Sequence, residues 1–309
     1  MNIAEEILRG NPRAVARGIS LVENDGAAAQ DMMKAIFSHT GSSLVVGVTG
    51  SPGSGKSTLV DQMIEILRSR HKKIGIVAVD PSSPFTGGAI LGDRIRMMRH
   101  SSDPEVFIRS MATRGHLGGL AKATGEAISI LEAAGKDIIL VETVGVGQDE
   151  VEVVKMADII VVVLVPGMGD DIQAFKAGIM EIADLFVLNK ADSPETDRTE
   201  RQLRAMLELG SLNKIPKIIK TVATEGKGLE TLIEELEKVT EDRDLEVQAS
   251  RRKRLISWML MDIISAKIYR TVTDELPEAE MEQYVEQIWR RELDPYTIAD
   301  QIVEKLKRT

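Results

Sequence analysis

Residues 50–58 read Gly50-Ser51-Pro52-Gly53-Ser54-Gly55-Lys56-Ser57-Thr58, which matches the phosphate-loop pattern G-x-x-x-x-G-K-[ST] in full. The apolar run 44–49 before it is typical of a buried parallel strand, and apolar residues at helical spacing follow it through Arg68. A strand, a glycine-rich loop and a helix N-terminus therefore meet at one point, where backbone N–H groups and the helix dipole attract a polyphosphate. The pattern predicts that Lys56 reaches the β- and γ-phosphates and that the Ser57 hydroxyl binds Mg2+.

The rest of the chain is expected to support this loop. From residue 42 to about 240, apolar strands alternate with amphipathic helices, which predicts an α/β fold with a doubly wound, mostly parallel sheet. Residues 1–41 are expected to form an N-terminal helical extension and residues 241–309 a C-terminal helical segment. In such a sheet, ligands bind at the carboxyl ends of the strands. The predicted strands are 44–49, 74–79, 105–109, 137–141, 159–165, 185–189 and 216–222.

Acidic residues follow two of these strands. Asp80 ends the second strand and Asp93 lies on the loop beyond it, so both are predicted to approach the magnesium shell. The alternative is that Asp80 caps a turn and that Asp93 pairs with a neighbouring arginine. Glu142 closes the apolar strand 137–141, which is the Walker-B arrangement that holds Mg2+ or its waters. A structural, salt-bridged glutamate is the alternative for Glu142.

A second motif, Asn189-Lys190-Ala191-Asp192, follows the sixth predicted strand and resembles the N-K-x-D guanine motif of G proteins. The Asp192 carboxylate can accept hydrogen bonds from guanine N1–H and the 2-amino group, a donor pair that adenine lacks. We expect Asn189 to brace the phosphate loop and the Lys190 stem to lie over the base. After the next strand, Val222-Ala223-Thr224 stands where G proteins usually carry a Ser-Ala pair, and a backbone N–H there is expected to meet the base oxygen.

Composition excludes several other classes of protein. The 309 residues contain no cysteine, which rules out disulfides and thiolate metal sites, and the four histidines are scattered at 39, 71, 100 and 116. A net charge of −9 argues against a nucleic-acid binder, and the basic run 251–254 favours a solvated helix face or a partner contact. No apolar run approaches the about 20 residues that span a bilayer, and no secretory signal is visible, so no membrane association and a cytoplasmic location are predicted.

The order of these motifs resembles the MeaB/ArgK/MMAA family of SIMIBI-class G proteins, which are GTPase chaperones of adenosylcobalamin-dependent methylmalonyl-CoA mutase. The likeness spans about residues 10–240, and the C-terminal helices fit the family's dimerisation arm by position only. The resemblance implies GTP or GDP and Mg2+ as ligands and a homodimer as the assembly. The roles that it implies fall on Lys56, Glu142 and Asp93 in catalysis, on Ser57, Asp80, Asp93 and Glu142 around Mg2+, and on Asn189, Lys190 and Asp192 at the base.

The resemblance also implies a third switch, in which Asp170, Gln173 and Lys176 couple the nucleotide state to a partner. A helix N-terminus capped by Asp170 and Asp171 explains the same residues nearly as well. The predicted function is a GTP-hydrolysing chaperone, slow alone and stimulated by an adenosylcobalamin-dependent acyl-CoA mutase whose cofactor loading and protection it gates. A GTP-dependent metal-centre insertion protein and a P-loop kinase remain the alternatives.

Overall fold

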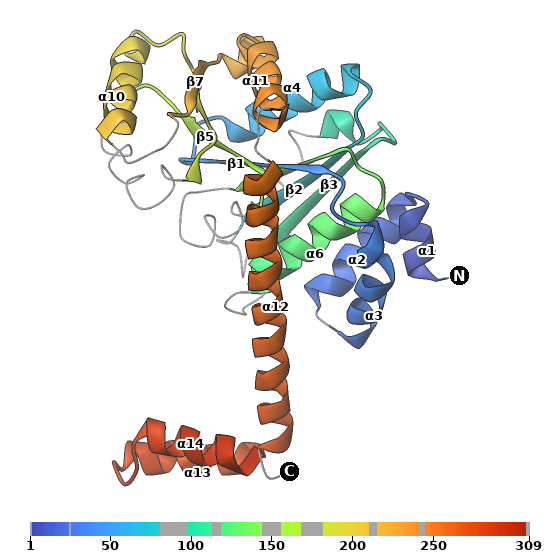
Figure 1. The fold of residues 1–309 in the computed structure, drawn as a ribbon, viewed down its shortest axis with the longest axis vertical. Coiled ribbons are helices and arrows are strands. Elements are labelled where there is room, and N and C mark those ends of the chain that lie inside the picture. Colours follow the sequence, from blue (N-terminus) through green and yellow to red (C-terminus); the bar gives the residue numbers. More distant parts are fainter. Residues whose placement is uncertain are drawn as a thin grey trace. The chain divides into compact units, whose positions relative to one another are not determined.

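Seven parallel strands form the central sheet, in the order β3-β2-β4-β1-β5-β6-β7 (Figure 1). This sheet, in a computed structural model of the chain, confirms the predicted α/β class, and each predicted strand overlaps one observed strand. Because β1 lies in the middle, the carboxyl ends of its neighbours surround the loop that leaves it. The strands are β1 (Leu44–Gly50), β2 (Ile74–Asp80), β3 (Val106–Ala112), β4 (Ile138–Thr143), β5 (Ile159–Leu164), β6 (Leu185–Leu188) and β7 (Lys217–Lys220).

Helices cover both faces of the sheet, which explains why its central strands are continuous apolar runs. Every residue of β5 and β6 is buried, and so is every residue of β1 and β4 after the first. On one face, α4 (Lys56–Ser69) and α11 (Leu229–Glu241) share a hydrophobic core with the strands. On the other face lies α6 (Gly119–Ala133), whose Leu131 side chain approaches the backbone of Gly75 in β2. The helix α10 (Thr196–Leu209) connects β6 to β7.

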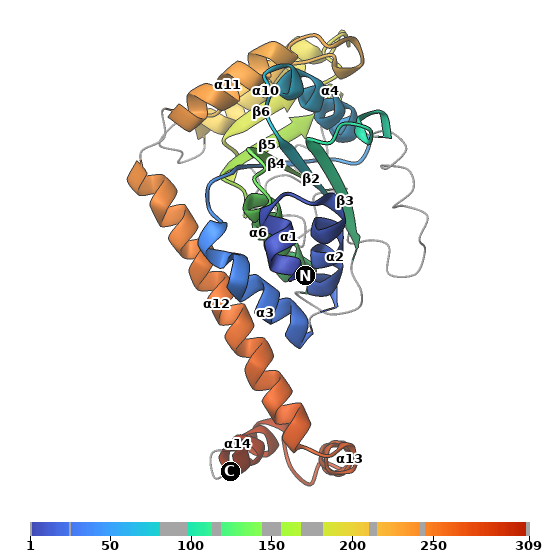
Figure 2. The ribbon, with the colours of Figure 1, turned by 90° about the vertical axis from the view of Figure 1, so that its right-hand side faces the viewer.

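Three N-terminal helices pack against α6 (Figure 2). They are α1 (Ile3–Leu8), α2 (Pro12–Glu23) and α3 (Ala27–Ile36). Side chains of Asn2 and Asn11 cap the first two helices by accepting backbone N–H bonds. Arg109 of β3 also pairs with Glu23 of α2 at 2.5 Å, which ties the helical extension to an edge strand.

The structure describes residues 2–24, 26–80, 98–112, 119–143, 156–167, 182–209, 215–241 and 245–306. The chain divides into two compact units, Met1–Arg251 and Arg252–Thr309. The borders predicted after residues 41 and 240 stay predictions. Of the helices within the described ranges, none is long and apolar enough to cross a bilayer, and the cytoplasmic location stays a prediction.

The second unit is helical. It contains most of α12 (Leu245–Glu275), followed by α13 (Glu278–Trp289) and α14 (Pro295–Leu306). Lys305 of α14 pairs with Glu280 of α13 at 2.7 Å, and Leu276 and Ile298 are buried. Many large apolar side chains of this unit are exposed instead: Ile256, Leu260, Met261, Ile264, Ile268, Tyr269, Met281, Val285, Trp289, Tyr296 and Val303.

Candidate nucleotide site

The phosphate loop joins the end of β1 to the start of α4, and two of its glycines are required by the backbone. Gly50 has φ 152° and Gly55 has φ 90°, in the region that favours glycine. A Cβ on Gly50 would collide with the backbone carbonyl of Val163, and a Cβ on Gly55 would collide with the side-chain amide of Asn189. The loop is therefore packed closely against β5 and against the residue that follows β6.

Lys56 and two serine hydroxyls give this loop the character of an anion site. The Lys56 side chain is buried, and its Nζ donates to the carbonyls of Gly50 at 2.8 Å and Ser51 at 2.9 Å. The hydroxyls of Ser51 and Ser54 are also buried, and neither has a hydrogen-bond partner among the described residues. Burying polar groups without partners costs free energy, which a ligand rich in acceptor oxygens would recover. A polyphosphate fits this arrangement.

Glu142 and Ser57 meet at the predicted magnesium position. The Ser57 hydroxyl donates to Glu142 Oε1 at 2.6 Å, and Glu142 is only 4% exposed. Glu142 lies opposite Val48 in the β1–β4 ladder, which brings its carboxylate to the first turn of α4. A hydroxyl and a carboxylate oxygen are donors suited to Mg2+. The residues present therefore fit the ion.

The remaining predicted magnesium residues are less fully described. Asp80 is the last residue of β2 and pairs in register with Ala112 of β3, so its backbone lies at the same edge of the sheet as Glu142. Asp93 lies outside the described residues, as do Asp170, Gln173 and Lys176 of the predicted third switch. Within the described part of the chain, no group of three or more His, Cys, Asp or Glu side chains is arranged to hold a metal.

Asn189 connects the phosphate loop to the guanine motif. Its Nδ2 donates to the Ser54 carbonyl at 2.9 Å, while its Oδ1 accepts from Thr221 Oγ1 at 3.0 Å and from the Ala223 N–H at 3.1 Å. Asn189 is 2% exposed. One buried amide thus fastens three segments together: the phosphate loop, the end of β6 and the turn after β7.

The other residues of the guanine motif surround this amide. Lys190 has φ 56°, uncommon for a residue with a side chain, and its Nζ donates to the Gly53 carbonyl at 2.9 Å. The Lys190 stem therefore crosses over the loop, and Asp192 is exposed beside it. In the segment Val222-Ala223-Thr224, Val222 and Ala223 are buried and Thr224 is exposed. The Ala223 N–H already donates to Asn189, so it is engaged by the protein itself.

Two threonine contacts near the site were not predicted from the sequence. Thr221 supplies one of the three bonds to Asn189, and Thr143 donates from its hydroxyl to the Thr49 hydroxyl at 3.0 Å. Threonine is common in strands because of its branched side chain. The residue type therefore carries no signal of a polar role, and only the pairing of the strands reveals these contacts.

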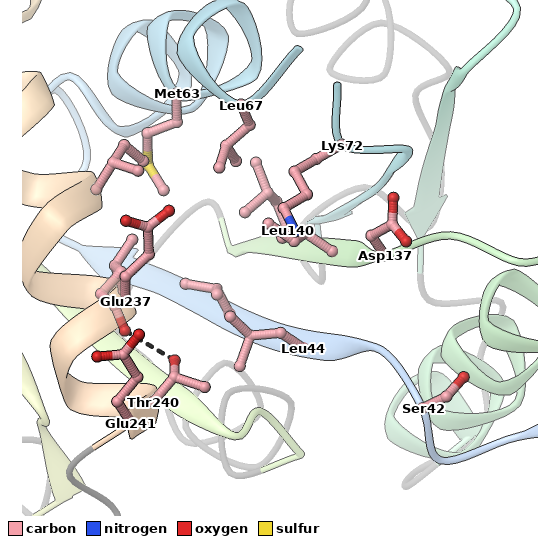
Figure 3. Close-up of a pocket in the computed structure, with 14 residues that line it drawn as sticks. Ser42, Leu44, Met63, Leu67, Lys72, Asp137, Leu140, Glu237, Thr240 and Glu241 are labelled. Carbon is pink, nitrogen blue, oxygen red and sulfur yellow. Dashed lines mark hydrogen bonds between the residues drawn. The ribbon is translucent and has the colours of Figure 1, made fainter. Parts of the chain in front are cut away.

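A separate pocket of about 280 Å³ opens at the opposite, amino-terminal ends of β1 and β4 (Figure 3). Met63 and Leu67 of α4 face it from one side, and Glu237 and Glu241 of α11 face it from another. Its floor includes Leu44, the first residue of β1. None of the predicted site residues lines it, so it is distinct from the phosphate loop.

Comparison with known proteins agrees with this geometry. The family described as "Methylmalonyl Co-A mutase-associated GTPase MeaB" matches residues 15–275. A protein of Pyrococcus abyssi named "Putative GTPase PYRAB02490" is 48% identical over 98% of this chain and 96% of its own. "GTPase ArgK" of Escherichia coli is 43% identical over 62% of this chain and 60% of its own.

A mammalian relative and a solved structure extend this comparison. The mouse protein "Methylmalonic aciduria type A homolog, mitochondrial" is 31% identical over 88% of this chain and 72% of its own. A crystal structure described as "LAO/AO transport system kinase" has a TM-score of 0.70 and 24% identity, covers 99% of this chain and 96% of its own, and shows a shared fold. Because the MeaB family matches residues 15–275 and the phosphate loop is bonded to a guanine motif, the chain belongs to the MeaB family of GTPases.

Proposed function

We propose that this GTPase is a chaperone of an adenosylcobalamin-dependent acyl-CoA mutase of the methylmalonyl-CoA mutase type, and that it gates the loading and protection of the mutase cofactor. The observation that carries this proposal is the match of residues 15–275 to a family described as mutase-associated. The mouse relative, whose printed name refers to methylmalonic aciduria, supports the same assignment. Cobalamin is expected on the mutase, because no histidine here has an aspartate two residues before it.

In this function GTP and GDP bind at residues 50–58, with Lys56 at the β- and γ-phosphates. Ser57 and Glu142 hold Mg2+, together with Asp80 and Asp93, and the ion supplies charge neutralisation at the phosphates. Asp192 reads the guanine edge, the Lys190 stem covers the base, and the segment 222–224 borders the base oxygen. The support is the convergence of the loop, Glu142 and Asn189 at one edge of the sheet.

Hydrolysis is slow without a partner in this proposal, because no side chain is assigned to orient the attacking water. Mutase binding supplies the stimulation, and Asp170, Gln173 and Lys176 couple the nucleotide state to the mutase. The protein acts as a homodimer whose interface is formed by the second unit. The exposed large apolar side chains of α12, α13 and α14 support this assembly, since exposed apolar side chains that gather in one patch mark interaction sites.

The decisive experiment measures GTP hydrolysis by the purified protein, alone and with an adenosylcobalamin-dependent acyl-CoA mutase from the same genome. Stimulation by the mutase, absent in the Lys56→Ala variant, is the expected result. A rate that the mutase leaves unchanged contradicts the chaperone assignment.

Two alternatives are tested with the same protein. A metal-centre insertion protein would bind nickel, as in the solved structure of HypB from Helicobacter pylori in complex with nickel, which shares the fold at 20% identity and a TM-score of 0.50. Equilibrium dialysis with nickel tests this function. A kinase would transfer labelled γ-phosphate to an amino acid or a protein, and hydrolysis to free phosphate without any acceptor argues against it.

A further inference from the structure

A buried pair of hydroxyls links the two strands that carry the phosphate loop and Glu142. Thr143 Oγ1 donates to Thr49 Oγ1 at 3.0 Å, and the two residues are 0% and 1% exposed. Thr49 directly precedes Gly50, the first residue of the phosphate loop. Thr143 directly follows Glu142 and is the last residue of β4. The contact therefore lies where both functional segments leave the sheet.

The position of this pair in the strand ladder shows what it does. The recorded register between β1 and β4 ends with Val48 opposite Glu142. The Thr49–Thr143 contact is the next rung, formed by side chains. Successive residues of a strand point to opposite faces, so Glu142 faces α4 while Thr143 faces the side covered by α6. Polar side-chain contacts thus lie on both faces of this edge, Ser57–Glu142 on one face and Thr49–Thr143 on the other.

The ladder between β4 and β2 extends to Val79 opposite Thr143, whereas the ladder between β4 and β1 stops one residue earlier, at Val48 opposite Glu142. The hydroxyl pair therefore carries the link between β4 and β1 one residue further. Hydrogen bonds on both faces oppose rotation of the strand end about its own axis, which is the motion that would swing the Glu142 carboxylate relative to Ser57. Because a magnesium ligand set tolerates little deviation from its preferred geometry, such a rotation weakens ion binding more than it weakens folding. Contacts that orient metal ligands have this effect generally.

We propose that Thr143 is a positioning residue, which through its hydroxyl bond to Thr49 holds the Glu142 carboxylate in place for Mg2+ and fixes the end of β4 to the strand that carries the phosphate loop. This inference rests on the proposed function, in which Glu142 holds the ion. In this proposal Thr143 acts through Glu142, from the opposite face of the sheet.

The test compares Thr143→Val, Thr143→Ser and the double variant Thr49→Val/Thr143→Val with the parent protein. Valine keeps the shape but removes the bond, serine keeps the hydroxyl, and the double variant replaces the polar pair by an apolar one. The measurements are the Mg2+ concentration that gives half-maximal GTP hydrolysis, the GDP affinity in EDTA, and the urea midpoint of unfolding.

The Mg2+ concentration for half-maximal activity is expected to rise about tenfold in Thr143→Val, the lower end of the losses that follow removal of a contact supporting a metal ligand. GDP affinity in EDTA stays unchanged, and Thr143→Ser behaves like the parent. The double variant leaves neither hydroxyl facing an apolar group, so its urea midpoint is expected to lie above that of Thr143→Val, but it keeps the raised Mg2+ requirement.

A purely structural role of the pair predicts a different pattern. In that case the Mg2+ requirement of Thr143→Val stays at the parent value, or the double variant restores it together with the urea midpoint, and either result overturns the inference. If the parent hydrolyses GTP independently of Mg2+, the magnesium assignment of the proposed function fails with it. A Mg2+-dependent parent with an unchanged Thr143→Val variant refutes the inference alone.

Discussion

Replacing Asn189 with alanine tests how the phosphate loop is fastened to the guanine motif. The Asn189 side chain is 2% exposed and makes three hydrogen bonds, at 2.9, 3.0 and 3.1 Å. Each such bond contributes about 1 kcal/mol net, so Asn189→Ala is expected to lower the free energy of unfolding by about 3 kcal/mol. For a unit of this size, that loss corresponds to a fall in Tm of about 6–12 °C.

The assay is urea unfolding of the full chain followed by circular dichroism, with fluorescent GDP binding measured on the same samples. Asn24→Ala is the matched control, because the exposed Asn24 side chain donates to the Ser20 carbonyl at 2.9 Å, far from the loop. Surface changes of this kind alter stability by about 0.5 kcal/mol at most. Asn189→Asp tests the bond to Ser54 separately from the bonds to Thr221 and Ala223. It keeps the oxygen that accepts from Thr221 and Ala223 but places a carboxylate oxygen against the Ser54 carbonyl.

Weaker GDP binding in both Asn189 variants is expected, because the loop loses its anchor in each. The reasoning is refuted if Asn189→Ala costs less than about 1 kcal/mol, the value of a single bond. It is also refuted if Asn189→Asp binds GDP as tightly as the parent. In that case the Asn189–Ser54 contact does not hold the loop in its binding shape.

Three further outcomes are expected. Gly50→Ala should lower GDP affinity at least about tenfold, because the added Cβ meets the Val163 carbonyl, and unchanged affinity in a binding titration would contradict the close packing. Hydrogen bonds lower the pKa of Glu235 below its ordinary value, first the bond from Lys217 and then the bond from Lys238. The contribution of Glu235 to stability is therefore full above about pH 4.3 and disappears as the pH falls through the lowered pKa. Urea midpoints measured against pH should show a smaller loss on acidification in Glu235→Gln, and identical profiles would refute this. If the protein is the proposed homodimer, Trp289→Ala should shift sedimentation toward the monomer with little change in unfolding, since Trp289 is 81% exposed. A dimer that this variant leaves unchanged would exclude Trp289 from the interface.

The sequence predicts the sheet well because its strands are buried on both faces. Continuous runs such as 159–165 and 185–189 have few alternatives in an α/β chain, and the observed β5 and β6 differ from them by one residue at one end. Larger differences occur at other strand ends: the third strand is predicted to end at 109 but continues to Ala112, and the seventh is predicted over 216–222 but spans Lys217–Lys220. The prediction ends the fourth strand at residue 141, whereas β4 continues through Glu142 to Thr143, because its ladder with β2 extends to Val79 opposite Thr143.

The sequence predicts only those parts of the candidate site that lie within local motifs. The spacing of the residues within 50–58 and 189–192 identifies these two motifs. No spacing in the sequence indicates that the Asn189 amide, which follows β6, contacts Thr221 and Ala223, which follow β7. The strand order brings these segments together, and that order is a property of the whole sheet. For the same reason, the sequence predicts Glu142 near Mg2+ but not its bond to Ser57, which depends on the register of β4 against β1.

In this structure Lys56 bonds to the phosphate loop itself, which limits what the Lys56→Ala control can show. Its ammonium is 5% exposed and is satisfied by two loop carbonyls, so the protein does not bury an unpaired charge. A phosphate oxygen carries negative charge and a carbonyl oxygen does not, so a bound phosphate is expected to attract the ammonium away from Gly50 and Ser51. In the proposed function, Lys56 therefore supports the loop before nucleotide binds and the phosphate afterwards. Lys56→Ala removes both, and loss of hydrolysis in this variant reports on catalysis only if its urea midpoint matches that of the parent.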